Sequence, residues 1–200
     1  MRLIPIFIII FLYMDIIIPL FGGISAKLYD DIVDEKIEAS DVVKECLKGL
    51  QWMSLAILSV NDFNFILIFY IMNVLNYFGD PSAFSCSYEF SLLLMVPLLF
   101  LFSFDTIHSF SYIDMICVFG FLILFYVEPY FMPNNVSYAK LIHRSIGTIL
   151  FILLLFWSDY LHISPSITKI TTYLIGYGTV SVIFQLYILK QNSQDPNKNK

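Results

Sequence analysis

The sequence contains few charged residues. They make up 14% of the chain, whereas about a quarter is usual in soluble domains. Hydrophobic residues account for 58%, and the mean hydropathy is +0.78. A water-soluble domain of 200 residues needs more polar surface than this composition supplies. The sequence therefore predicts a polytopic membrane protein, in which lipid solvates most of the apolar surface.

Basic residues, cysteines and common catalytic motifs are also scarce. The net charge of −5 and the lack of a basic patch argue against nucleic-acid binding, which depends on Lys and Arg neutralising phosphates. Cys46, Cys86 and Cys117 are widely spaced and form no CxxC pair, so we expect small buried apolar residues at these positions. The sequence contains no P-loop, dinucleotide-binding fingerprint, nucleophile elbow or zinc-protease motif.

Long apolar runs separated by polar or Pro-containing stretches dominate the chain. About 20 apolar residues in a helix cross a bilayer, so each run is a candidate span. The runs are Leu3–Ile24, Val42–Val60, Phe63–Phe78, Tyr88–Phe104, Tyr112–Val127, Leu141–Trp157 and Ile167–Leu189. We therefore predict an all-α membrane bundle of about seven transmembrane helices, with the first run retained as an uncleaved helix. Residues 1–190 would form one domain, and the polar residues 191–200 a disordered tail.

The basic residues indicate an orientation for this bundle. With seven spans, nine of the eleven Lys and Arg residues fall on one side of the membrane, and only Arg2 and Lys169 fall on the other. Cytoplasmic loops of membrane proteins carry such an excess. The sequence therefore predicts an integral membrane protein with its N-terminus outside and its C-terminus in the cytoplasm.

The sequon Asn135-Val-Ser137 tests this orientation, because the predicted topology leaves it on the cytoplasmic side. When the chain is expressed in a glycosylating cell, we expect Asn135 to carry no glycan and endoglycosidase to leave its gel mobility unchanged. A mobility shift that disappears in an Asn135→Gln variant would reverse the orientation.

An acidic stretch follows the first apolar run. It contains Asp30, Asp31, Asp34 and Glu38, and a helix continuing through it would place the last three on one face. Carboxylate oxygens are ligands for hard divalent cations, so the stretch is a candidate Mg²⁺ site. The alternative is that these carboxylates form the solvated side of an amphipathic connector.

Written as Asp30-Asp31-x-x-Asp34-x-x-x-Glu38, the stretch resembles the first aspartate-rich motif, NDxxDxxxD, of the UbiA superfamily of membrane prenyltransferases. The resemblance implies that these four residues hold Mg²⁺ at the cytoplasmic end of a helix, and that the ion grips a prenyl diphosphate. In that family a second aspartate-rich motif lies four helices later. Here a single Glu128 stands at that place, and the seven predicted spans compare with the nine usual in the family.

Lys140 and Arg144 lie four residues apart on the predicted cytoplasmic side, where they could pair with a diphosphate.

Asp15 lies within the first apolar run, and carboxylates inside membranes often mark proton or ion paths. Three functions remain open: Mg²⁺-dependent binding or transfer of a prenyl or lipid diphosphate, a non-catalytic membrane scaffold or assembly protein, and a small-solute or proton transporter that uses Asp15. The sequence does not decide whether the protein is an enzyme.

Small residues on two of the predicted helices allow close packing. Gly22 with Ala26, and Gly176 with Gly178, would let neighbouring backbones approach.

Overall fold

The structure is a computed structural model that describes residues 3–33, 37–62, 65, 69, 111–131 and 138–194. The described ranges contain five α-helices and no strand, which confirms the all-α class. The helices are α1 (Leu3–Val33), α2 (Asp41–Asn61), α5 (Tyr112–Phe131), α6 (Tyr138–Phe156) and α7 (Pro165–Gln194).

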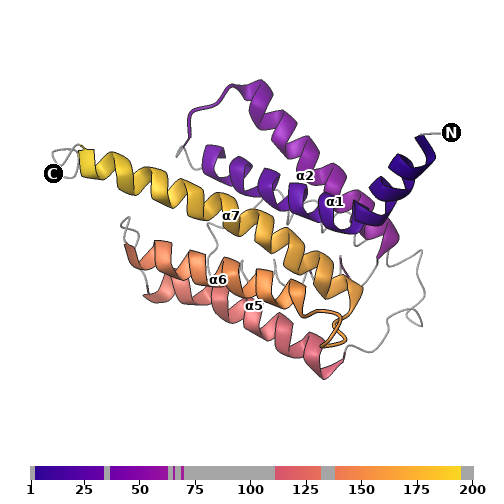
Figure 1. Ribbon diagram of the computed structural model, residues 1–200. Coiled ribbons are helices and arrows are strands. Elements are labelled where there is room, and N and C mark those ends of the chain that lie inside the picture. Colours follow the sequence, from indigo (N-terminus) through magenta and orange to yellow (C-terminus); the bar gives the residue numbers. More distant parts are fainter. Residues whose placement is uncertain are drawn as a thin grey trace, which may run out of the picture.

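The long helix α7 lies at the centre of the described bundle, with α1 on one side and α6 on the other (Figure 1). Helix α2 packs against α1, and α5 lies beside α6. Gly23 of α1 lies against Tyr173 of α7, and Lys27 lies against Tyr177, so these two helices run in the same direction.

Short polar segments set the helix boundaries. Ser40 caps α2 because its hydroxyl accepts a hydrogen bond from the Val43 N–H. Ser164 caps α7 in the same way, and Pro165 follows at the first helical position, where its missing N–H costs nothing. Pro19 lies inside α1, and the N-terminal part of this helix is inclined to the remainder (Figure 1). A proline ring bends a helix in this way because it removes a backbone hydrogen bond.

The described bundle is more polar inside than outside. Its buried residues include more polar or charged side chains than apolar ones, while many large apolar side chains are exposed. The exposed ones include Ile146, Ile149 and Leu153 of α6, and Ile183 and Leu186 of α7. A soluble domain shows the opposite arrangement, whereas bundles in lipid use buried polar groups to join their helices.

Two of the described helices, α6 and α7 through Gln191, are long and apolar enough to cross a membrane. The count of seven spans is not supported by the described residues. The predicted spans Phe63–Phe78 and Tyr88–Phe104 lie outside them, apart from Phe65 and Phe69. Helix α7 continues to Gln194, and the rest of the predicted tail lies outside the described residues.

Candidate functional site

The candidate site is a group of charged and hydroxyl side chains where α1, α6 and α7 meet. It consists of Lys27, Asp30 and Asp31 of α1, Arg144 of α6 and Tyr177 of α7, and we call it the Tyr177 cluster.

Lys27, Asp30 and Asp31 lie at positions i, i+3 and i+4, so they project from one side of α1. The Lys27 Nζ donates hydrogen bonds to Asp30 Oδ2 and Asp31 Oδ1, both at 2.8 Å. The side chains of Lys27 and Asp31 are 5% and 1% exposed, whereas that of Asp30 is 32% exposed. Asp30 is therefore the carboxylate of this pair that an external ion or ligand can reach.

Lys27 follows the span predicted over Leu3–Ile24 and is charged in the structure. Burial alone lowers the pKa of a lysine, but Tyr177, Asp30 and Asp31 raise the pKa of Lys27 well above its ordinary value. The protonated amine supplies a positive charge between the two carboxylates.

Tyr177 connects this group to the rest of the bundle. Its hydroxyl donates a hydrogen bond of 3.3 Å to Asp30 Oδ2, and the Lys27 Nζ lies 5.3 Å from the centroid of its ring. Arg144 lies one turn before Thr148 on α6, and Thr148 contacts Gly178, the residue after Tyr177. The fold therefore brings the part of α6 that carries Arg144 near the residue that joins the acidic pair to α7.

Glycines make this meeting of three helices possible. A Cβ at Gly23 would clash with the Tyr173 carbonyl oxygen, and a Cβ at Gly176 would clash with that of Leu20. A Cβ at Gly178 would meet the Thr148 side chain of α6, and a Cβ at Gly22 would meet the Ser54 side chain of α2. The structure confirms close approach at Gly22, Gly176 and Gly178 and adds Gly23.

The other predicted ligands do not all join the cluster. Helix α1 ends at Val33, and the Ile37 N–H donates to the Asp31 carbonyl oxygen. Exposed Glu38 lies beyond the end of α1, so one helix does not carry all four acids. Asp34 lies outside the described residues. Glu128 lies within α5, but its side chain is not among those described.

Lys140 is half-buried on α6, one turn before Arg144. The described residues contain no group of three or more His, Cys, Asp or Glu side chains that could hold a metal ion. The Mg²⁺ site at Asp30, Asp31, Asp34 and Glu38 thus stays a prediction, because one of its four residues is not described.

A second ionic group lies near the start of α7. Lys169 Nζ lies 3.1 Å from Asp62 Oδ2 and 3.6 Å from Asp15 Oδ1, and the Ser166 hydroxyl donates to Asp62 Oδ1 at 2.8 Å. The Asp15 carboxylate faces Lys169, and the Asp15 side chain is 73% exposed.

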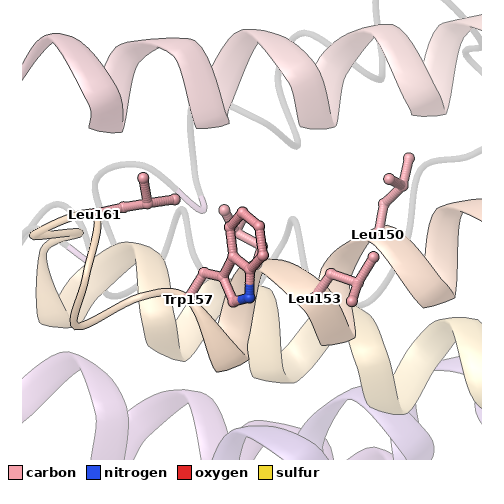
Figure 2. A pocket seen from close by; sticks show the side chains of 5 residues that line it. Leu150, Leu153, Trp157 and Leu161 are labelled. Carbon is pink, nitrogen blue, oxygen red and sulfur yellow. The ribbon is translucent and has the colours of Figure 1, made fainter.

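An apolar groove lies on α6 and the turn after it. Its volume is about 200 Å³, and it is lined by Leu150, Leu153, Leu154, Trp157 and Leu161. Figure 2 shows the labelled side chains of α6 projecting from the helix on the side that faces α5. None of these five side chains is charged, and among them only the Trp157 indole N–H can donate a hydrogen bond, so the groove offers mainly apolar contact.

Sequence reasoning missed Lys27, Tyr177 and the pairing of Asp62 with Lys169. The spacing of Lys27 and Asp31, four residues apart on a helix, could have revealed the first of these.

Comparison of the chain with protein-family models, with curated proteins and with solved structures found no match. The resemblance to the UbiA superfamily therefore rests on the acidic stretch alone.

Proposed function

We propose that the chain is a multi-pass membrane protein that binds the head group of a prenyl or lipid diphosphate at the Tyr177 cluster, with Mg²⁺ between the phosphates and Asp30. The observation that carries this proposal is the hydrogen bond from the Tyr177 hydroxyl to Asp30, together with the contact of Thr148, one turn after Arg144 on α6, with Gly178 beside Tyr177. Seven spans, with the N-terminus outside and the cluster toward the cytoplasm, are part of the proposal.

The charges suit such a ligand. Lys27 and Arg144 balance Asp30 and Asp31, and Lys140 adds one positive charge a turn away on α6. Mg²⁺ and a diphosphate together carry a net negative charge, and Mg²⁺ commonly binds through one or two carboxylates plus phosphate oxygens. Arg144 can donate two parallel hydrogen bonds to a phosphate. Asp31 is then an anchor for Lys27, and partly exposed Asp30 is the group that reaches the ion.

The test is titration calorimetry of the full chain in nanodiscs with farnesyl diphosphate and Mg²⁺. We expect Arg144→Gln or Asp30→Asn to weaken binding about tenfold or more, since charged hydrogen bonds contribute roughly 1.5–3 kcal/mol. Chelation of Mg²⁺ should weaken binding similarly. Lys190→Gln and Asp159→Asn, both on exposed side chains, are the matched controls and should leave binding unchanged.

A second titration with inorganic diphosphate separates head-group binding from chain binding. If farnesyl diphosphate binds equally well to the Arg144→Gln protein, or without Mg²⁺, the site is not at the Tyr177 cluster. If the unaltered protein does not bind farnesyl diphosphate, the proposal is wrong and the scaffold alternative is favoured.

A further inference from the structure

The N-terminal part of α1 extends past the start of α7. The two helices run in the same direction, and Gly23 of α1 lies against Tyr173 of α7. Continuing this register along both helices places Asp15 level with Pro165, the first residue of α7. Residues 3–14 of α1 therefore lie beyond the start of α7, and we call them the N-terminal arm.

Helix α2, the other neighbour of α1, ends at the same level. Its last residue is Asn61, and the carboxylate of the next residue, Asp62, lies 3.1 Å from Lys169 Nζ near the start of α7. The same Nζ lies 3.6 Å from Asp15 Oδ1. Helix α1 contains buried Pro19, and Figure 1 shows its N-terminal part inclined away from α7. The arm therefore leaves the bundle where α2 ends and α7 begins.

This level has the features of a membrane face. Helices α6 and α7 are each long and apolar enough to cross a membrane, and the turn of residues 157–164 joins them. The side chains of Trp157 and Tyr160 in this turn are strongly exposed. Tyr112 at the start of α5 is exposed as well, and nearby Asp114 accepts a hydrogen bond from the N–H of the last residue of the turn. Exposed Trp and Tyr side chains gather where membrane helices reach the lipid head groups.

The arm is apolar but short. Leu3–Met14 contains twelve residues, none of them charged, between Arg2 and Asp15. As a helix it is about 18 Å long at 1.5 Å per residue, whereas the hydrocarbon core is about 30 Å thick. Apolar segments of this length are typical of interfacial segments rather than of spans. A charged residue at each end favours a position with both ends near the head groups.

We propose that the N-terminal arm lies along the membrane, within the leaflet next to the turn between α6 and α7, and anchors this end of the bundle in lipid. The arm contacts the upper part of the acyl chains, while Arg2 and Asp15 lie at the level of the head groups. This arrangement requires the membrane insertion that is part of the proposed function, but not the binding of a diphosphate. The crossing part of α1 then begins near Asp15, whereas the sequence predicted a span over Leu3–Ile24.

The experiment measures the depth of the arm in nanodiscs that contain the full chain. The three native cysteines are replaced by alanine, and a nitroxide label is attached to a single new cysteine in Ile6→Cys, Ile9→Cys or Tyr13→Cys. Power saturation of the electron paramagnetic resonance signal, with oxygen and with a water-soluble nickel complex, gives the depth of each label. Residues 6 and 13 lie two turns apart on one face of the helix, so we expect their labels at equal depth. All three labels should be more accessible to oxygen than to the nickel complex.

Two further labels supply reference depths. Ile149→Cys on the exposed side of α6 should be deep in the hydrocarbon, and Tyr160→Cys in the turn should lie near the surface. The arm labels should fall between these two references.

Three results would overturn the inference. A difference of about 10 Å in depth between residues 6 and 13 would show an arm perpendicular to the membrane plane. Ready access of the nickel complex to all three arm labels would place the arm in water, and exclusion of both reagents would place it against protein. With any of these results, a deep label at residue 149 leaves the membrane insertion of the bundle intact. A water-accessible label at residue 149 contradicts that insertion and the inference together.

Discussion

Replacing Gly23 by alanine will lower the free energy of unfolding by about 3 kcal/mol, as expected for an extra methyl group forced into a closely packed contact. The new Cβ would clash with the backbone carbonyl oxygen of Tyr173, and it would also approach the Tyr177 backbone nitrogen. Both are main-chain atoms, so α1 and α7 must move apart as whole helices. The measurement is denaturant unfolding of the purified full chain in micelles, followed by helical circular dichroism.

Gly147→Ala on α6 is the control for this result. A Cβ at Gly147 meets no atom within 4 Å among the described residues, and alanine favours a helix over glycine by about 0.5–1 kcal/mol. This variant should be as stable as the unaltered chain or slightly more so. If Gly23→Ala and Gly147→Ala unfold at the same denaturant concentration, the backbone contact between α1 and α7 does not exist in solution.

The helical class of the chain could be predicted because it depends on local composition. Apolar runs such as Leu141–Trp157 and Ile167–Leu189 coincide closely with α6 and α7. The small residues at 176 and 178 also indicated close packing without any knowledge of the neighbouring helix. These features are visible in single segments of about 20 residues.

The candidate site could be predicted only in part, because its contacts join distant segments. Nothing near Asp30 in the sequence shows that Tyr177 will donate to it, since the two are 147 residues apart. Asp62 and Lys169 are separated by 107 residues, and only the packing of α2 against the start of α7 brings them together. The spacing of acids alone suggested a metal site, whereas the structure shows that Lys27 already occupies part of it.

The end of α1 was mispredicted for a physical reason. The periodicity of the acidic stretch fits a helix through Glu38, but α1 ends at Val33 and Glu38 lies outside it. The spacing of side chains along the sequence shows which residues would share a helix face, but it does not predict the residue at which the helix ends.

Replacing Lys27 by methionine will cost about 3–5 kcal/mol in the free energy of unfolding, the usual effect of removing one partner of a buried ion pair. Methionine fills a similar volume, so the loss comes from the charge. The Asp31 side chain is 1% exposed, and without the ammonium group its carboxylate remains in an interior from which water cannot solvate it. Denaturant unfolding in micelles again measures the change.

Two further variants separate the loss of charge from the loss of packing at Lys27. In the double variant Lys27→Met with Asp31→Asn, no uncompensated charge remains at the buried pair, so most of the lost stability should return. Lys48→Met is the matched control on α2, where the Lys48 Nζ lies 5.2 Å from the Trp52 ring centroid. Both side chains are half-buried, and removing a cation–π contact near the surface costs about 0.5–1 kcal/mol. A double variant no more stable than Lys27→Met alone would contradict a stabilising pair between Lys27 and Asp31. It would mean that the Lys27 side chain stabilises the bundle by filling space beside Tyr177, and the charge balance proposed for the diphosphate site would then lose its basis.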